Sequence, residues 1–349
     1  MMVSSSVCTT RASLTSEVTM VDRLEDIGFY TLSDARCAGA GVLPGGKLSP
    51  LSRCELILTD KCNFKCPYCR GVKDEYSGVM DWEETKRTLS LWFEHDLKNV
   101  RFSGGEPMTY GQQRLVTLGC MCKDAGVEHI AISTNGSFSI EKYEELIHCG
   151  FNDFSISLDA CCAATGDKMA GGIRGAWAKV VENIAAISKK TYVTVGIVLT
   201  DDNVEEMVET VEFAHGLGVA DIRIISSAQS NAFLAAAALI PDIVLDAHPI
   251  LKYRVNNIAT GRHVRGLCDG DSSRCGLVID DIAAVGGYHF PCIIYLREGG
   301  KPIGKVGPEM RQERLEWFKK HCSYCDPICK KNCLDVCIDY NNKFRDTHK

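Results

Sequence analysis

The sequence predicts an α/β protein in which a partial, open (β/α)6 barrel is followed by a cysteine-rich C-terminal domain. From Glu55 onward, short β-rich runs alternate with amphipathic helical segments, which is the rhythm of parallel βαβ units. Six such units follow one another, too few to close an eight-stranded barrel. After Arg262 this rhythm stops and cysteines accumulate toward the C-terminus.

The individual elements follow from the periodicity of the apolar residues and from the turn residues between them. The predicted strands are residues 55–59, 99–103, 129–134, 153–158, 192–199 and 221–226. The predicted helices lie near 81–95, 110–125, 140–149, 175–189 and 203–217. Each helix connects two strands, so the strands are expected to run parallel.

The composition changes along the chain predict four regions. Residues 1–50 form an N-terminal arm, partly disordered, which ends in a Gly/Pro/Ser-rich stretch. Residues 51–230 form the barrel. Residues 231–261 form a helical bridge that begins Ala/Leu-rich and continues after Pro241. Residues 262–349 form the cysteine-rich domain, which we expect to hold metal.

Composition and charge exclude several classes of protein. The chain has 349 residues, 45% of them hydrophobic and 24% charged, which is ordinary for a globular protein. Its net charge of −6 does not favour binding a nucleic acid. No apolar run is long enough to span a bilayer, and the first 20 residues lack the apolar core of a secretory signal. We therefore expect a cytoplasmic protein with no membrane partner.

The cysteine content is unusually high, with 19 cysteines in the chain. Such a number indicates either a disulfide framework or metal binding. Disulfide-dense chains are mostly small and secreted. This chain is large and groups its cysteines at short spacings, so metal binding in a reducing compartment is the favoured interpretation.

The first cysteine motif is C-x3-C-x2-C, formed by Cys62, Cys66 and Cys69 in the loop after the first predicted strand. Three thiolates on one loop can hold three irons of a [4Fe–4S] cluster and leave the fourth iron open. A zinc site would need a fourth ligand, and no other Cys or His lies nearby in the sequence. The motif therefore predicts an iron–sulfur cluster with one open position.

This motif resembles the signature of the radical S-adenosylmethionine (SAM) superfamily, whose fold is a partial TIM-like barrel. The resemblance implies that the open iron binds SAM and that Cys62, Cys66 and Cys69 are the catalytic ligands. One electron then cleaves SAM to a 5′-deoxyadenosyl radical, which abstracts a hydrogen atom from the substrate. It also implies a low-potential electron donor such as flavodoxin or ferredoxin. Tyr68 matches the aromatic residue that packs on adenine.

Three further stretches resemble SAM-binding segments of the same superfamily, and each follows a predicted strand. The first resembles the GGE motif, whose backbone and glutamate bind the SAM ammonium group. The second matches a segment near the ribose and methionine, and the third a serine near the SAM carboxylate or ribose. The residues are Gly104, Gly105 and Glu106, then Thr134 and Asn135, then Ser157 and Asp159.

The C-terminal region contains eight further cysteines at short spacings, enough for two closed [4Fe–4S] clusters. The pattern resembles the SPASM domain of radical SAM peptide maturases, which gives three clusters in all. The resemblance implies one auxiliary cluster on Cys268, Cys275, Cys292 and Cys333 and another on Cys322, Cys325, Cys329 and Cys337. Two spacings differ from the family pattern. A single-cluster twitch domain on Cys275, Cys292, Cys322 and Cys325 is one alternative, and zinc ribbons are another.

The other eight cysteines show no ligand pattern, and most are expected to be small buried hydrophobic residues. Cys161 and Cys162 follow the fourth strand, near the carboxyl end of the barrel. Packing is the favoured interpretation for both. A thiol at this place is also suited to donate a hydrogen atom to a substrate radical, as in radical SAM epimerases.

The motifs predict a radical SAM enzyme, most plainly one that oxidises a peptide or forms a bond in it. Modification of a small molecule, sugar or nucleotide is the alternative. The core also resembles the GTP cyclases of molybdenum-cofactor synthesis, but their C-terminal Gly-Gly pair has no counterpart in Thr347-His-Lys349. Ile293 stands where sulfatase maturases have an aspartate. A non-enzymatic zinc or redox protein is the alternative of a different class.

Overall fold

Six parallel strands follow one another in chain order and form one curved sheet with three later strands. The computed structural model describes residues 37–71, 74–227 and 232–348. The sheet order is β6-β5-β4-β3-β2-β1-β7-β8-β9. The first six strands are β1 (Arg53–Thr59), β2 (Asn99–Gly104), β3 (His129–Thr134), β4 (Asp153–Ser157), β5 (Tyr192–Leu199) and β6 (Asp221–Ser226). These are the six predicted strands, so the partial (β/α)6 barrel is confirmed.

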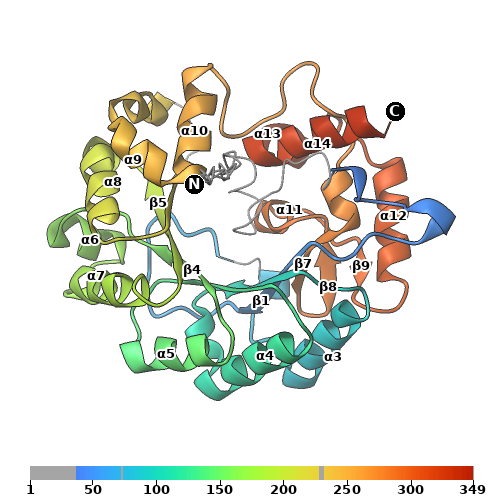
Figure 1. Ribbon diagram of the computed structural model, residues 1–349, viewed down its shortest axis with the longest axis horizontal. Coiled ribbons are helices and arrows are strands. Elements are labelled where there is room, and N and C mark those ends of the chain that lie inside the picture. Colours follow the sequence, from blue (N-terminus) through green and yellow to red (C-terminus); the bar gives the residue numbers. More distant parts are fainter. Residues whose placement is uncertain (1–36, 72–73, 228–231, 349) are drawn as a thin grey trace, which may run out of the picture.

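Helices connect these strands and lie along the outside of the curved sheet (Figure 1). They are α3 (Trp82–Phe93), α4 (Gln112–Asp124), α5 (Ile140–His148), α6 (Ala163–Met169), α7 (Ala176–Ile187) and α8 (Met207–Gly216). Five of these helices were expected. The short α6 was missed, because seven residues are too few to show a helical period.

The alternation of side chains along the strands separates an outer core from a polar interior. Residues such as Leu56, Phe102, Ile132 and Phe154 point outward, are fully or almost fully buried, and form one large apolar cluster with the helices. Their neighbours on the strands point into the barrel and include charged residues such as Glu55. The interior of the barrel is therefore not filled by apolar packing alone.

The C-terminal region continues the same sheet. Strand β7 (Asp281–Val285) pairs in parallel with β1, and β8 (Tyr288–Phe290) and β9 (Gly304–Lys305) follow as antiparallel strands. Helices α11 (Ile293–Arg297), α12 (Met310–Lys320), α13 (Pro327–Asn332) and α14 (Asp335–Thr347) complete this region. In Figure 1, α10, α13 and α14 lie across the open side of the curved sheet.

The predicted bridge has a different local structure from a continuous helix. It contains the 3-10 segment Ala232–Leu239, then α9 (Asp242–Ala247) and α10 (Pro249–Ala259). Prolines at 241 and 249 interrupt a longer helix, because proline lacks the amide hydrogen that the helix needs. The side chain of Asp221 accepts hydrogen bonds from the amides of Ile250 and Leu251 and so caps the start of α10.

The predicted N-terminal arm lies mostly outside the described residues, which begin at Cys37. Cys37 and Ala40 are buried against a second apolar cluster that contains Tyr340 and Phe344 of α14. In the described parts of the chain, no helix combines the length and the hydrophobicity that crossing a membrane requires.

Candidate active site and metal centres

The three-cysteine loop follows β1 and stands at the carboxyl ends of the parallel strands. Cys62 and Cys69 are exposed and Cys66 is partly buried. The amide of Phe64 donates to Sγ of Cys62 at 3.4 Å, and the amide of Cys69 donates to the carbonyl of Cys66 at 3.0 Å. The backbone of the loop therefore folds back on itself and turns three thiols toward one region.

The three thiols line one cavity of about 170 Å³, which we call the three-cysteine cavity. Its polar lining comes from the carboxyl ends of β3 and β4, and its apolar lining from the loop, α6 and α7. The predicted site residues on it are Cys62, Cys66, Tyr68, Cys69, Gly105, Thr134, Asn135, Ser157 and Asp159. Phe64, Met169, Trp177 and Val180 also line it and were not singled out in the sequence, where they have the pattern of ordinary core residues.

Two of the thiols of this cavity, Cys62 and Cys66, have a raised pKa. Burial raises the pKa of Cys62, and burial followed by the nearby carboxylate of Asp159 raises the pKa of Cys66 to about 11. A thiol must lose its proton to bind a metal, so metal binding here releases protons. Three thiols on one loop beside a cavity fit a cluster with one open iron.

Gly104 and Gly105 are required by the close approach of two backbone segments. A Cβ on Gly104, whose φ is +146°, would lie 2.2 Å from the carbonyl oxygen of Thr59. A Cβ on Gly105 would lie 2.3 Å from the carbonyl oxygen of Lys61. The amide of Gly105 donates to the Thr59 carbonyl at 2.6 Å. The glycine pair therefore holds the start of the three-cysteine loop against the end of β2.

The side chain of Glu106 lies at the junction of β2 and β3. Its side chain is fully buried and does not line the three-cysteine cavity. The carboxylate accepts hydrogen bonds from the amides of Met108 (3.0 Å) and Asn135 (2.7 Å) and from the hydroxyl of Thr134 (2.8 Å). Burial raises its pKa to about 7, although these hydrogen bonds act in the opposite direction. Glu106 thus joins the ends of β2 and β3, and its contact with the SAM ammonium group stays a prediction.

Asn135 connects the end of β3 to the three-cysteine loop. Its side-chain amide donates to Oδ1 of Asn63 at 2.8 Å and approaches Sγ of Cys62 at 3.8 Å. Asn63 in turn donates to Ser137 at 2.8 Å. Asn63 and Ser137 were not predicted, because polar loop residues give no signal of this kind in the sequence.

Five C-terminal cysteines line a second cavity, which we call the five-cysteine cavity: Cys275, Cys292, Cys329, Cys333 and Cys337. Burial raises the pKa of Cys275 to about 11 and that of Cys292 to about 12. The pKa of Cys333 is raised well above its usual range, first by a hydrogen bond with Cys337 and then by burial. A buried group of thiols in this number fits the ligand set of a closed iron–sulfur cluster.

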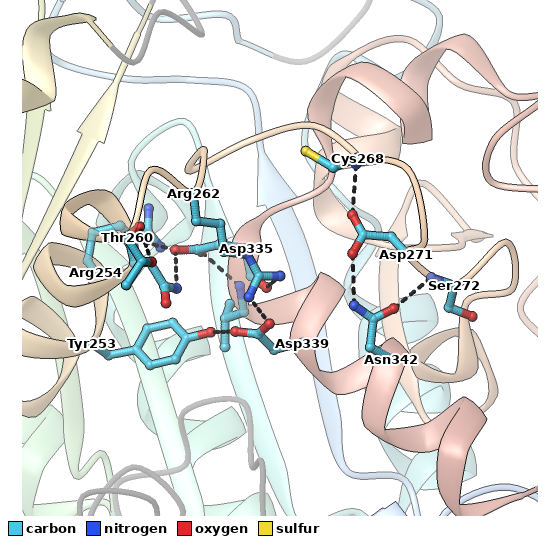
Figure 2. Close-up of polar contacts among 12 residues, drawn as sticks. Tyr253, Arg254, Thr260, Arg262, Cys268, Asp271, Ser272, Asp335, Asp339 and Asn342 are labelled. Atoms are coloured by element: carbon cyan, nitrogen blue, oxygen red, sulfur yellow. Dashed lines mark hydrogen bonds and ion pairs between the residues drawn. The ribbon is translucent and has the colours of Figure 1, made fainter.

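The other three C-terminal cysteines lie apart from the lining of this cavity. Sγ of Cys325 is 2.8 Å from Sγ of Cys322, and the hydroxyl of Tyr324 donates to the carbonyl of Cys268. The amide of Cys268 donates to Asp271, whose other oxygen accepts from Asn342 of α14 (Figure 2). These positions differ from the grouping that the resemblance implies, which stays a prediction. Cys337 stands with the first group of thiols, and Cys268 stands near the Cys322–Cys325 pair.

Cys329 lies between the two groups. It lines the five-cysteine cavity, and its Sγ is 3.6 Å from Nε2 of His321, the residue before Cys322. Ligand atoms of His321, Asp326 and Cys329 lie within 4.8 Å of one another. His321 and Asp326 were not among the predicted ligands, although both adjoin predicted cysteines in the sequence.

The other cysteines of residues 37–348 that the structure describes do not line either cysteine cavity, and Cys8 lies outside the described residues. Cys37, Cys54 and Cys122 are fully buried, as expected of small apolar residues. Cys161 and Cys162 do not line the three-cysteine cavity. Sγ of Cys161 approaches Glu206 at 3.8 Å instead, so the structure favours packing over hydrogen-atom donation for this pair.

Comparisons with known proteins show which families and structures this chain resembles. The radical SAM superfamily model matches residues 56–214. A GTP 3',8-cyclase of Rhizobium leguminosarum bv. trifolii is 32% identical over 183 residues, which are 49% of this chain and 50% of that protein. A GTP 3',8-cyclase of Brucella abortus is 29% identical over 178 residues, 49% of this chain and 51% of that protein. The chain thus spans about half the length of the curated relatives it matches.

Solved structures share the fold at low sequence identity. SuiB of Streptococcus suis bound to S-adenosylmethionine superposes with a TM-score of 0.54 and 16% identity, over 78% of this chain and 66% of SuiB. The protein anSMEcpe with bound AdoMet gives a TM-score of 0.56 and 15% identity, over 86% of this chain and 94% of that protein. The segment that matches the family model, residues 56–214, contains the three-cysteine loop and most of the partial barrel. Residues 56–214 of this chain form a radical SAM domain, which supports a radical SAM enzyme, and the cysteine-rich C-terminal part fits an auxiliary iron–sulfur domain.

Proposed function

We propose that this protein holds a [4Fe–4S] cluster on Cys62, Cys66 and Cys69, cleaves SAM reductively and removes a hydrogen atom from a small-molecule substrate. The observation that carries the proposal is that the three thiols share one cavity with groups at the carboxyl ends of β3 and β4. Ligand sites of parallel α/β sheets form at this end. When bound, such a cluster supplies one electron to SAM, which breaks a carbon–sulfur bond and gives methionine and a 5′-deoxyadenosyl radical.

The residues around the thiols would orient SAM and exclude water. Ser157 is exposed at the end of β4 and offers a hydroxyl to the ribose or carboxylate. The ring of Tyr68 and the indole of Trp177 offer apolar surfaces to adenine and ribose. Gly105 lines the cavity with backbone, which lets a ligand approach closely. Water exclusion matters because a carbon radical must meet its substrate before any other hydrogen donor.

We also propose two auxiliary clusters with four thiol ligands each. Cys275, Cys292, Cys333 and Cys337 share the five-cysteine cavity. Cys322 and Cys325 adjoin each other, the hydroxyl of Tyr324 between them reaches the Cys268 carbonyl, and Cys329 approaches His321, next to Cys322. We therefore assign Cys268, Cys322, Cys325 and Cys329 to the second cluster. This assignment exchanges Cys268 and Cys337 relative to the family pattern.

The substrate is proposed to be a small molecule of the nucleotide or sugar class. The curated relatives are named as GTP 3',8-cyclases, which act on a nucleotide, and their identity of 28–32% is about twice that of the structural neighbours. SuiB has been solved with its precursor peptide SuiA, yet at 15% identity this likeness concerns the fold. Peptide modification, the first expectation from the sequence, stays a prediction.

Deuterium transfer tests both the chemistry and the substrate class. Cells of the source organism are grown in deuterated medium, and their extract is added to the anaerobically reconstituted protein with dithionite and unlabelled SAM. We expect deuterium to appear in 5′-deoxyadenosine, because hydrogen abstraction moves one atom from substrate to the SAM-derived product. Prior treatment of the extract with proteinase K should leave the transfer intact. If the protease abolishes the deuterium transfer, while phosphatase treatment or size filtration of the extract leaves it intact, the substrate is a peptide instead.

A further inference from the structure

A third cavity lies inside the barrel between the two cysteine cavities, and we call it the arginine cavity. It measures about 120 Å³ and is lined by inward-facing residues of β1, β2, β4, β5 and β6 and by α10. A single water needs only about 10–15 Å³ by this measure, so there is room for a group of several heavy atoms. The charged residues on its wall are Arg53, Glu55, Arg101, Asp153, Arg223 and Arg254.

The arginine cavity adjoins the three-cysteine cavity along the strands. Ser155 lines the arginine cavity, and Ser157, two residues further along the same face of β4, lines the three-cysteine cavity. Two residues of a strand span about 7 Å. Nη1 of Arg101 donates to Ser133 at 3.1 Å, and Ser133 lines the three-cysteine cavity. A molecule in the arginine cavity therefore lies within reach of the site proposed for SAM.

The arginine cavity also adjoins the auxiliary-cluster region. Arg53, Glu55 and Ile293 line both the arginine cavity and the five-cysteine cavity. Ile293 directly follows Cys292, a proposed cluster ligand. The arginine cavity thus occupies the position that a substrate needs in order to meet the radical on one side and an auxiliary cluster on the other.

Three of the four arginines have a carboxylate partner, and one does not. Arg53 faces Asp281 at 3.8 Å, Arg101 pairs with Asp153 at 2.9 Å, and Nε of Arg254 lies 3.1 Å from Oδ2 of Asp335. Figure 2 shows Arg254 on α10 beside Asp335 of α14. Within residues 37–71, 74–227 and 232–348, Arg223 has no ion-pair partner within 4.0 Å. Its guanidinium donates only to Ser155, at 3.4 Å.

Several N–H groups around the cavity are buried without an acceptor in the described structure. They include Nε of Arg223 and Nη1 of Arg254, whose side chain is 2% exposed. An unsatisfied buried donor of a charged group is costly. Burial, followed by repulsion from Arg101 and Arg254, lowers the pKa of Arg223 to about 10, although the carboxylates of Glu55 and Asp153 act in the opposite direction. The charge of Arg223 is therefore incompletely compensated.

We propose that the arginine cavity binds an anionic group of the substrate, a phosphate or a carboxylate, through Arg223 and Arg254. The guanidinium group presents paired N–H donors that match the oxygens of either anion. Gly196 of β5 is the sheet partner of Arg223 on β6. This inference rests on the proposed function, because it names the part of the small-molecule substrate that the barrel interior would hold.

Anion binding by the reconstituted full chain tests the inference. The probes are radiolabelled inorganic phosphate and malonate, each measured by equilibrium dialysis in the presence of SAM. We expect saturable binding of at least one probe, and Arg223→Gln should weaken it about ten-fold or more, since a charge-assisted contact is lost. The control is Arg87→Gln on α3, whose side chain is 72% exposed and far from the cavity lining; it should bind as the parent does.

The two probes distinguish the anion classes: phosphate alone indicates a phosphate ester, malonate alone a carboxylate, and both an anion site of broad selectivity. If the parent binds neither probe, or if Arg223→Gln and Arg87→Gln behave alike, the inference is overturned. Should Arg223→Gln fail to fold, Arg223→Lys replaces it, and unchanged binding by that variant also overturns the inference. SAM cleavage by the parent is measured in the same preparation without any probe. Absence of SAM cleavage would contradict the proposed function, whereas absence of anion binding alone would contradict only this inference.

Discussion

The hydroxyl of Tyr68 donates a hydrogen bond of 2.5 Å to Oδ2 of Asp159, which joins the three-cysteine loop to the end of β4. Oδ1 of Asp159 accepts from the amide of Val198 on β5 at 2.7 Å. Burial raises the pKa of Asp159 to about 6, and the two hydrogen bonds act to lower it. One buried carboxylate therefore connects the cysteine loop to two neighbouring strands and fixes the position of the Tyr68 ring in the cavity.

Two substitutions of Tyr68 separate the ring from the hydroxyl. Tyr68→Phe removes the donor and leaves a buried oxygen of Asp159 unpaired, so the free energy of unfolding should fall by about 1–3 kcal/mol. SAM affinity should change little, because the ring remains. Tyr68→Leu should weaken SAM binding as well, since the aromatic surface for adenine is lost. Equilibrium dialysis of SAM decides this, and equal affinity of the Phe and Leu variants would refute the adenine contact.

Glu106→Gln tests the position of this side chain. In the structure the carboxylate faces three donors, and a glutamine would turn an N–H group toward at least one of them. We expect the free energy of unfolding to decrease by about 1–3 kcal/mol, as for other buried hydrogen bonds that lose a partner. Urea denaturation beside the exposed control Glu182→Gln measures the effect. A fully stable variant with weakened SAM binding would instead restore the direct ammonium contact.

His289 on β8 predicts a dependence of stability on pH. The side chain is fully buried, and burial, followed by the nearby Arg314, lowers its pKa to about 3, although its Nε2 lies 2.9 Å from a carboxylate oxygen of Glu313. The unfolded chain binds a proton below pH 6.5 and the folded chain does not. Stability is therefore lost as the pH falls below 6.5, by about 1.4 kcal/mol per pH unit for this one group.

The variant His289→Gln isolates this contribution. Buried carboxyl groups such as Glu106, whose pKa is raised, make stability depend on pH in the opposite direction, but they are the same in the parent and the variant. Free energies of unfolding at pH 7.5, 6.5 and 5.5 should fall less steeply in the variant than in the parent. The exposed His148→Gln serves as the control and should retain the slope of the parent. Parallel slopes for the parent and His289→Gln would contradict the prediction.

The grouping of the auxiliary cysteines can be read from iron content in double variants. Two substitutions in one cluster should remove about four irons together, whereas substitutions in two clusters should remove about eight of about twelve. We expect Cys275→Ala with Cys337→Ala to remove about four, and Cys275→Ala with Cys268→Ala about eight, by the same count. The grouping implied by the family pattern requires the reverse result. Anaerobic reconstitution followed by iron and sulfide analysis measures both pairs.

Much of the fold could be predicted from the sequence, because each barrel strand is a short apolar run bounded by turn residues. Their parallel order follows from the helices between them. The helices of the bridge, residues 231–261, were harder to predict, because Pro241 and Pro249 divide a segment whose composition favours a continuous helix. That β7 joins β1 could not be predicted either. This pairing links residues more than 200 positions apart, and no local pattern encodes it.

The site was predictable where chemistry is carried by spacing, and less so where it depends on tertiary contacts. Cys62, Cys66 and Cys69 share one loop, so their convergence follows from the chain itself. The burial of Glu106 depends on the amide of Asn135 from another strand, which the sequence does not reveal. The position of Cys337 depends on how α14 packs against the cavity.

Reductive SAM cleavage by the Cys62, Cys66 and Cys69 triple alanine variant tests the central claim most directly. Parent and variant are reconstituted anaerobically with iron and sulfide, reduced with dithionite and incubated with SAM, and 5′-deoxyadenosine is quantified by mass spectrometry. The account predicts no 5′-deoxyadenosine from the variant, which should still hold about eight irons on its auxiliary sites, against about twelve in the parent. Formation of 5′-deoxyadenosine by the variant at the rate of the parent would contradict it.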